Sequence, residues 1–518
     1  MTAQRLLPFG DRAVLVEVDG LDEVLAVHAR LAASRPDGVV DLVPGARTVL
    51  VRIDPRRLSV PAARAWITGT TAAPGSAPAA PRSIEVPIAY DGPDLGDLAA
   101  ELGTSPQELA ERHSRCVWTV AFTGFAPGFG YLVSADWPYD IPRRASPRTR
   151  VPAGAVGLAG GFTGAYPRET PGGWQLIGST PAPLFDPDAP MPALLAPGMR
   201  VRFVPTATPT PSPTPTATRA PVRTPTPTPG AVARVIAPGA FATVQDLGRP
   251  GRAAEGIAVS GAADRSALRR ANRLVGNPED AAAIEVAVGG FRAVADADVW
   301  IAVTGAGGAI RLGGRVVDGS IAQLWRRGDE LNLDPFGHGA RAYLAVRGGL
   351  DGRAVAGSRS TDTLSGLGPA PLAAGDALAL ACPRPATPVP VTDLAPWGPP
   401  GDTIDVALAP GPRADWLADP HALFEAVWTV SPQADRVGIR LDGPRLDRAR
   451  DGELPSEGMI PGAIQVPPDG RPVILGPDGP VTGGYPVVAV VADSSLDALG
   501  QARPGTRVRF RHARPETP

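Results

Sequence analysis

The chain has 518 residues, a formal net charge of −2 and only two cysteines. This length allows about three or four domains of ordinary size. Acidic and basic residues are mixed along the chain, which leaves no basic surface of the kind that binds nucleic acid or anionic membranes. Cys116 and Cys382 match no metal-ligand spacing, and no apolar run of about 18 residues occurs. We therefore expect a cytoplasmic protein that binds neither nucleic acid, nor a membrane, nor a metal ion.

All 50 basic residues are arginine, because the sequence contains no lysine. This excludes a phosphate-binding loop of the GxxxxGK[ST] type and any Schiff-base mechanism. A bound phosphate would have to be held by arginine side chains and backbone N–H groups.

Residues 1–83 are predicted to form a small α+β unit. Residues 12–18 and 48–53 alternate as half-buried strands do. Residues 21–34 read as a helix, with Val24, Val27 and Leu31 on one face.

Residues 84–204 read as short strands between glycine and proline turns, which indicates a closed or nearly closed β-barrel. One helix begins after Ser105, which is followed by Pro106 and Glu108 in the pattern of a capping box. The helix is expected to end near His113, directly before the strand that leads to an aromatic loop. His113 is therefore either a pocket residue with a chemical role or a hydrogen-bonded structural histidine.

That loop, over residues 121–132, alternates three phenylalanines with three glycines around Pro127. Glycine permits close backbone approach and aromatic rings supply rigid apolar walls, so the loop suits the lip of a pocket. The alternative is a tight hairpin plugged by buried phenylalanine. Arginines such as Arg144 and Arg148 and a second glycine-rich turn follow within the same domain.

Residues 205–230 are a Pro/Thr-rich, low-complexity tract that cannot build a core. We expect a linker between two folded halves. Residues 231–518 form the second half, which is again rich in predicted strands. Its first part crowds polar residues around Gly248, and residues 262–274 read as a short helix that ends at a glycine.

A short repeat relates the two halves. Residues 151–157 and 163–167 have counterparts in residues 460–465 and 482–486, with the same order of turn, strand and Thr-Gly-x-Tyr-Pro. This suggests two copies of one barrel, whose shared cleft would be a favoured ligand site.

The motifs resemble a known family over nearly the whole chain. Residues 1–204 resemble the B subunit of bacterial ATP-dependent 5-oxoprolinase, also described as allophanate hydrolase subunit 1, through His113, GFAPGFGYL, PRRASPRTRVPAGAVG and GGWQLIGSTPAPLFD. Residues 231–511 resemble the C subunit through TVQDLGRPG, SGAADRSALRRANRLVGN, SEGMIPGAIQVPPDG and TGGYP. Both halves are also similar to the carboxyltransferase domain of urea carboxylase. The resemblance implies a mainly β protein with tandem cyclophilin-like barrels, in which residues 84–204 correspond to carboxyltransferase subdomains C and D and residues 231–518 to subdomains A and B.

Lactam hydrolysis needs hydrogen-bond donors for the developing oxyanion, a cation and a base. Backbone N–H groups of residues 124–130 and of Gly154 are candidates for the first role, and Arg144, Arg148 or Arg249 for the second. The predicted catalytic residues are His113, Asp246 and Asp264. The predicted substrate-binding residues are Phe125, Pro127, Gly128, Phe129, Arg144, Arg148, Gly154, Tyr166, Gln245, Arg249, Ser260, Asn272, Glu457, Gln465 and Tyr485.

The resemblance implies hydrolysis of 5-oxo-L-proline with ATP, together with a separate A-type subunit that supplies or shares the ATP site. A lysine-free chain cannot carry covalent biotin. Two other functions stay open: a carboxyltransferase related to urea carboxylase and allophanate hydrolase, and a non-enzymatic module that regulates a kinase. In every case we expect the two halves to pair with each other.

Overall fold

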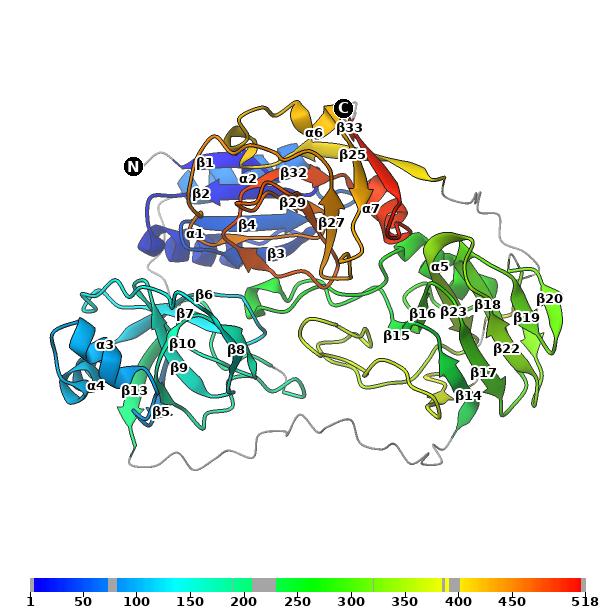
Figure 1. Ribbon diagram of the computed structural model, residues 1–518, viewed down its shortest axis with the longest axis horizontal. Coiled ribbons are helices and arrows are strands. Elements are labelled where there is room, and N and C mark those ends of the chain that lie inside the picture. Colours follow the sequence, from blue (N-terminus) through cyan, green and yellow to red (C-terminus); the bar gives the residue numbers. More distant parts are fainter. Residues whose placement is uncertain are drawn as a thin grey trace.

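The structure is a computed structural model that describes residues 4–72, 82–189, 191–206, 230–319, 321–383, 387–390 and 401–513. Four folded units follow one another along the chain (Figure 1). Nearly all of the linker predicted over residues 205–230 lies outside the described residues. In the part of the chain that is described, no helix combines the length and the apolar character needed to cross a membrane.

The N-terminal unit is an antiparallel sheet with strand order β1-β2-β4-β3, covered by two helices. The helix α1 buries Val24, Val27 and Leu31 as predicted, whereas α2 was not expected from the sequence. The elements are β1 (Arg5–Pro8), β2 (Ala13–Glu17), α1 (Leu21–Ala33), β3 (Val39–Pro44), β4 (Thr48–Ile53) and α2 (Val60–Ala72).

The second unit is a seven-stranded sheet with order β12-β9-β10-β7-β6-β13-β5. Its two edges meet where Ala89 and Ser179 exchange backbone hydrogen bonds of 2.8 Å, so the sheet closes into a barrel. The elements are β5 (Ser83–Ile88), α3 (Leu95–Glu101), α4 (Pro106–Arg115), β6 (Trp118–Thr123), β7 (Gly130–Val133), β8 (Arg148–Val151), β9 (Ala155–Ala159), β10 (Phe162–Ala165), β11 (Thr170–Gly172), β12 (Gln175–Ser179) and β13 (Arg200–Pro205).

The predicted capping box of α4 is confirmed. The Ser105 hydroxyl accepts from the Glu108 N–H, and the Glu108 carboxylate accepts from the Ser105 N–H. The helix runs two residues beyond His113.

The third unit packs a six-stranded sheet, β20-β19-β22-β17-β14-β24, against a five-stranded sheet, β15-β16-β23-β18-β21. The core between them includes Ile284, Phe291, Trp325 and Leu344. The elements are β14 (Ala231–Pro238), β15 (Phe241–Gln245), η1 (Ala253–Glu255), α5 (Arg265–Leu274), β16 (Ala283–Ala287), β17 (Phe291–Ala295), β18 (Val299–Gly307), β19 (Ile310–Leu312), β20 (Arg315–Val317), β21 (Gln323–Trp325), β22 (Glu330–Leu333), β23 (His338–Val346) and β24 (Ala377–Ala379).

The fourth unit is a closed barrel with order β25-β32-β29-β30-β27-β26-β33. The elements are β25 (Thr403–Pro410), η2 (Ala414–Trp416), α6 (Ala422–Glu425), β26 (Val427–Val430), β27 (Gly438–Asp442), β28 (Glu457–Gly458), β29 (Ala463–Gln465), β30 (Val473–Leu475), β31 (Thr482–Gly483), β32 (Val487–Val491), α7 (Asp493–Gly500) and β33 (Arg507–His512). The mainly β class with two cyclophilin-like barrels and a small N-terminal α+β unit is thus confirmed.

The two barrels have the same topology when their strands are compared in order around the ring. Each also has one parallel pair, formed by its first and last strands: β5 with β13 and β25 with β33. The first half of the predicted repeat falls on equivalent strands, β9 and β29. Its second half is wrong, because Thr163 lies in β10, whereas Thr482 lies in β31, whose counterpart is β11.

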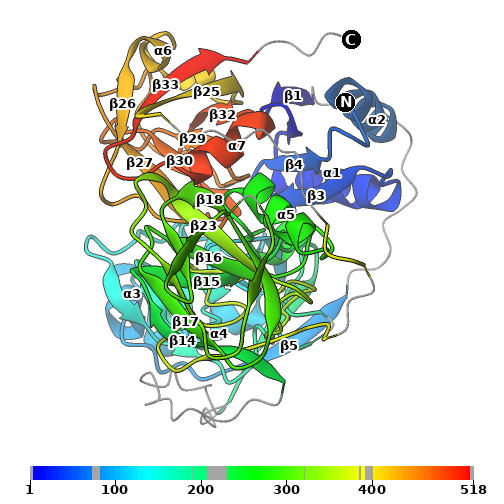
Figure 2. The same ribbon diagram turned by 90° about the vertical axis from the view of Figure 1, so that its right-hand side faces the viewer.

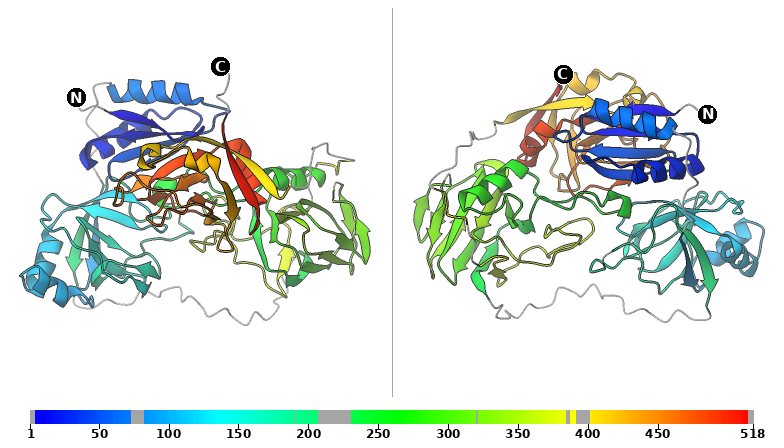
Figure 3. Two further views of the ribbon diagram at one scale, coloured as in Figure 1. Left: turned by 45° about the horizontal axis from the view of Figure 1, so that its top comes forward. Right: turned by 180° about the vertical axis from the view of Figure 1, so that it is seen from behind.

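The N-terminal unit packs on the C-terminal barrel although they lie at opposite ends of the chain (Figures 1 and 3). They share one apolar core, which removes hydrophobic surface of both from water. Its buried residues are Phe9, Ala13, Leu15, Val43 and Leu50 from the first and Met459, Ile460, Ala463, Leu475, Val487 and Val490 from the second.

A buried arginine reinforces this contact. Arg12, which is 4% exposed, donates to the carbonyl oxygens of Val491 (2.8 Å) and Pro461 (2.7 Å) in the barrel. Asp11 accepts from Arg12 (2.7 Å) and from the Asp493 N–H (2.8 Å) at the start of α7.

A second contact holds η1 of the third unit between the N-terminal unit and the first barrel. Asp41 accepts from the first N–H of η1 (3.1 Å). The Thr123 hydroxyl (2.6 Å) and the Gly128 N–H (3.2 Å) donate to η1 carbonyl oxygens. Figure 2 shows the third unit below the C-terminal barrel, and Arg265 in α5 of the third unit donates to Asp493 (3.0 Å) and Asp497 (3.0 Å) in α7.

We predict that residues 1–206 and 230–518, produced as separate chains, form a complex that survives gel filtration at micromolar concentration. Arg12→Ala should weaken that complex by about thirtyfold or more in titration calorimetry, because it leaves two carbonyl oxygens without their donor and the partly buried carboxylate of Asp11 without its cation. Arg5→Ala is the matched control, since Arg5 is 68% exposed in its ion pair with Glu17. Halves that stay apart, or an equal loss in both variants, would contradict this account.

Candidate functional site

A small pocket, partly open to solvent, lies where the first barrel meets the second half of the chain. The first barrel contributes Phe125, Pro127 and Arg168. The second half contributes Gly256, Ala258, Asp362, Leu364, Ser365, Gly479, Pro480 and Val481. Apolar walls with a few polar groups are typical of small-molecule sites.

The aromatic loop between β6 and β7 places Phe125 in this pocket. Phe125 has φ +63°, a conformation that is costly for a residue with a side chain. The Gly124 N–H donates to the Phe129 carbonyl (3.1 Å), and Phe129 packs edge-on to Phe125 at 5.4 Å. Phe125 stays 42% exposed, as expected of a pocket wall.

Asp362 enters the pocket from a turn of the third unit. Its Oδ1 accepts from the N–H groups of Leu364 (3.0 Å) and Ser365 (2.9 Å), which fixes the carboxylate at the head of the turn. Its Oδ2 is buried and has no hydrogen-bond partner among the described residues. Burial and the nearby charge of Asp478 raise the pKa of Asp362.

Arg168 reaches the same turn from the first barrel, between β10 and β11. Its Nη2 donates to the Leu364 carbonyl oxygen, and its Nε is buried without a partner among the described residues. Burial lowers the pKa of Arg168, an effect that the carboxylate of Asp362 opposes. The pocket therefore holds an arginine of the first half and an aspartate of the second.

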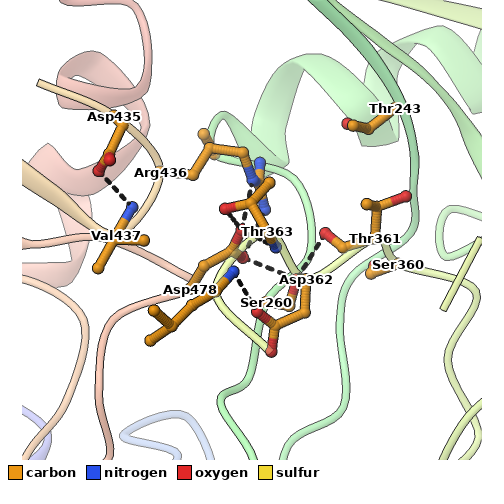
Figure 4. Close-up of polar contacts among 12 residues, drawn as sticks. Thr243, Ser260, Ser360, Thr361, Asp362, Thr363, Asp435, Arg436, Val437 and Asp478 are labelled. Carbon is orange, nitrogen blue, oxygen red and sulfur yellow. Dashed lines mark hydrogen bonds and ion pairs between the residues drawn. The ribbon is translucent and has the colours of Figure 1, made fainter. Parts of the chain in front are cut away.

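A buried ionic network lies beneath the Asp362 turn (Figure 4). Asp478 accepts two hydrogen bonds of 2.9 Å from Arg436, one of 2.8 Å from the Ser260 hydroxyl, and two from the N–H (2.9 Å) and hydroxyl (2.7 Å) of Thr363. Arg436 also donates to Glu285 (2.8 Å) in the third unit. The network joins the C-terminal barrel to the turn that carries Asp362.

His113 does not line the pocket. It is fully buried, with its ring nitrogens bonded to the hydroxyls of Tyr90 (2.8 Å) and Thr163 (2.9 Å). Its ring packs on Trp118 and Phe203 in the core of the first barrel. Burial lowers its pKa to about 3, so it stays neutral. The structural alternative fits this position, and the expectation that His113 faces the aromatic loop is wrong.

Asp246 and Asp264 are occupied by structural hydrogen bonds. Asp246 accepts from Gly248 N–H, Ser358 hydroxyl and Arg359 N–H, each at 2.7 Å, and so anchors the segment that leads to Asp362. Asp264 caps α5 and accepts from Gln501 (2.7 Å). Burial raises the pKa of Asp264 to about 6. Because Asp264 is the cap, α5 begins at Arg265 rather than at residue 262. Neither carboxylate lines the pocket.

The predicted arginines also lie outside the pocket wall. Arg144 (2.9 Å) and Arg148 (2.6 Å) both bind Asp94 within the first barrel. Arg249 is 2% exposed and donates to the Ser360 carbonyl, while its Nε and Nη1 have no partner among the described residues. Arg249 therefore helps to hold the 358–362 segment in place through its bond to the Ser360 carbonyl.

Two of the glycine N–H groups predicted to bind an oxyanion are already in use. The Gly128 N–H bonds to η1, as described above, and the Gly154 N–H donates to the Tyr166 carbonyl (2.7 Å). Phe129 and Tyr166 are buried in the aromatic cluster behind Phe125. Only Phe125 and Pro127 of the predicted first-half residues line the pocket.

The remaining predicted residues serve local structure. Gln245 donates to Thr243 and Thr361, and Asn272 to the Ala281 carbonyl. Ser260 does not line the pocket, and its hydroxyl lies within hydrogen-bond distance of Asp478 (2.8 Å) and of the Thr361 carbonyl oxygen (3.1 Å). Glu457 pairs with Arg413, Gln465 lies against Met459, and the Tyr485 carbonyl accepts weakly from Gln465 (3.5 Å).

Sequence reasoning missed Arg168 and Asp362. Both lie in short polar or turn-forming runs, PRET at 167–170 and SRSTD at 358–362. The second run was the one available signal. The two residues lie close together only because the halves dock, and residue spacing in the sequence does not predict that docking.

We predict that Arg436→Met destabilises the chain by about 3–5 kcal/mol, because it leaves the buried Asp478 without its cation and Glu285 with Arg341 alone. Arg450→Met, which breaks an ion pair whose side chains are 57% and 59% exposed, should cost less than about 1 kcal/mol.

The same network predicts a pH dependence. Burial raises the pKa of Glu285, but Arg436 and Arg341 outweigh this effect and hold that pKa below 4.5. The stabilisation is thus present above pH 4.5 and lost as pH falls, so the gap in melting temperature between wild type and Arg436→Met should narrow in acid. A constant gap would contradict this assignment.

Comparison with known proteins matches both halves of the chain. Residues 4–195 match the model of the carboxyltransferase domain, subdomains C and D, and residues 255–512 match subdomains A and B. The crystal structure of TTHA0988 superposes with a TM-score of 0.84 at 36% identity, covering 96% of this chain and 99% of that one.

The curated relatives divide between the halves. The C subunit of 5-oxoprolinase from Escherichia coli K12 is 37% identical over 287 residues, which is 54% of this chain and 90% of that protein. The B subunit of 5-oxoprolinase from Escherichia coli O157:H7 is 41% identical over 217 residues, which is 40% of this chain and 97% of that protein. Urea amidolyase of Lachancea kluyveri is 34% identical over 303 residues, 53% of this chain but only 16% of its own length. The chain therefore belongs to the carboxyltransferase-domain family that includes the B and C subunits of 5-oxoprolinase, and it carries the regions related to both in one polypeptide.

Proposed function

We propose that this chain is the fused B and C part of an ATP-dependent 5-oxoprolinase, which hydrolyses 5-oxo-L-proline to L-glutamate together with a separate A-type subunit. The observation that carries the proposal is the pocket between the halves, to which the first, B-like half contributes Arg168 and the second, C-like half contributes Asp362. The names of the relatives of both regions support the same reaction.

The chemistry suits this pocket. Opening the lactam breaks its C–N bond and adds the oxygen of water to the carbonyl carbon and a proton to the nitrogen. Resonance makes the amide resist attack, and coupling to ATP hydrolysis, which consumes a second water, makes the opening favourable. In the reaction the polar groups of the pocket would orient the amide, and the apolar walls would hold the ring and limit access of water.

ATP is assigned to the partner subunit or to its junction with this chain. The lysine-free sequence lacks a phosphate-binding loop of the GxxxxGK[ST] type. The pocket is also small for a nucleotide together with the lactam.

A second candidate is a carboxyltransferase of the urea amidolyase type, acting on biotin that another protein carries. The similarity of more than half of the chain to urea amidolyase favours it. Urea and the ureido ring of biotin present the same planar N–C=O unit as the lactam. Carboxyl transfer to urea from a biotinylated partner, without turnover of 5-oxoproline, would support this candidate over the first.

The test is release of ADP that depends on 5-oxo-L-proline, measured with the chain alone and with an A-type subunit. We expect little turnover by the chain alone and robust turnover with the partner.

Leu364→Trp fills the pocket and should lower the rate about tenfold or more, because the lactam can no longer reach its position. Val316→Trp is the control, since Val316 is 64% exposed and does not line the pocket. No turnover with the partner, or full turnover by Leu364→Trp, would contradict the proposal.

A further inference from the structure

Three buried polar atoms face the pocket region without a hydrogen-bond partner among the described residues. They are Arg168 Nε, Asp362 Oδ2 and Ser365 Oγ, and all three residues line the pocket. A buried polar group left unsatisfied is costly, and folded proteins rarely keep one without a reason. Three of them around one cavity point to a ligand that completes their hydrogen bonds.

The chemistry of these atoms defines what would bind. A guanidinium group only donates hydrogen bonds, whereas a carboxylate accepts them. Arg168 and Asp362 form no ion pair within 4.0 Å among the described residues, yet the carboxylate of Asp362 opposes the lowering of the pKa of Arg168. A ligand between them must therefore offer an acceptor to Arg168 and a donor to Asp362.

The ring size of the ligand follows from the peptide geometry. An open-chain secondary amide is trans, so its C=O and N–H point in opposite directions, and the cis form costs about 2.5–4 kcal/mol. A small ring forces the amide to be cis, which places C=O and N–H side by side on one edge. Such an edge can bind an arginine and an aspartate that line the same small pocket.

We propose that Arg168 and Asp362 form a clamp for the cis-amide edge of a five-membered lactam or cyclic urea, with Arg168 donating to the C=O and Asp362 accepting from the N–H. The proposal deepens the proposed function and rests on it for the identity of 5-oxo-L-proline as the natural ligand. Phe125, Leu364 and Pro480, which line the pocket, would form its apolar walls around the ring. Because the clamp takes one residue from each half, neither half can form it alone.

The test uses the full chain, without a partner subunit, and measures binding by ligand-observed NMR. The probes are 5-oxo-L-proline, 2-pyrrolidinone and N-methyl-2-pyrrolidinone. We expect the first two to bind and the N-methyl compound to bind at least about tenfold more weakly, because it lacks the N–H that donates to Asp362.

Asp362→Asn is the decisive variant. Its Oδ1 can still accept from Leu364 and Ser365, which preserves the turn. Its amide NH₂ then replaces Oδ2 and presents a donor where the lactam also has a donor. We expect binding of 5-oxo-L-proline to fall about tenfold or more without a change in melting temperature.

Asp435→Asn is the matched control. Asp435 heads a turn of the same kind, accepting from Val437 (2.8 Å) and Gly438 (2.9 Å), and it does not line the pocket (Figure 4). It should bind 5-oxo-L-proline as the wild type does. Arg168→Leu should lose binding of both N–H lactams.

The clamp is overturned if the wild type binds none of the probes, if the N-methyl compound binds as well as 2-pyrrolidinone, or if Asp362→Asn binds like the wild type. Failure of the proposed function has a different signature. In that case the lactams bind as predicted and Asp362→Asn weakens them, but no ATP-dependent hydrolysis follows when an A-type subunit is added.

Discussion

The candidate site depends on one buried carboxylate, Asp478, which ties three segments together. It accepts from Arg436 in its own barrel, from Ser260 in the third unit and from Thr363 in the turn that carries Asp362. Each of these donors is needed, since a carboxylate buried without a cation and hydrogen bonds would be strongly unfavourable. The position of Asp362 is therefore fixed by an interaction that forms only when the C-terminal barrel is docked.

The two barrels use equivalent connections to build opposite sides of the site. In the first barrel the β6–β7 connection supplies Phe125 and the β10–β11 connection supplies Arg168. In the C-terminal barrel the corresponding β26–β27 and β30–β31 connections supply Arg436 and Asp478. Both barrels of this pseudo-dimer thus line the pocket, the first through Phe125, Pro127 and Arg168 and the C-terminal barrel through residues 479–481. The C-terminal barrel also supports the turn from the third unit.

The local features of the fold were predictable from the sequence, because short-range rules govern them. The capping box at Ser105, the buried face of α1 and the barrel class all follow from residue spacing. The aromatic loop was also identified, and two of its residues line the pocket. These features require only neighbours in the sequence.

The rest of the site was not predictable from single residues. His113 was predicted to be catalytic because it precedes the strand that leads to the aromatic loop. The helix instead directs its ring into the core of the first barrel. Asp246 was predicted to be catalytic and Arg249 to bind substrate, because polar residues crowd there, yet both hold the 358–362 segment in place. Arg168 and Asp362 are 194 positions apart, and only the docking of the halves places them on one pocket.

The most direct measurement of the central claim, that the functional site lies between the halves, is a crystal structure of the chain with 5-oxo-L-proline. The account predicts the lactam against Phe125, within hydrogen-bond distance of both Arg168 and Asp362, with its N–H toward the aspartate. A lactam bound wholly within one half, or with its amide edge turned away from both residues, would contradict it.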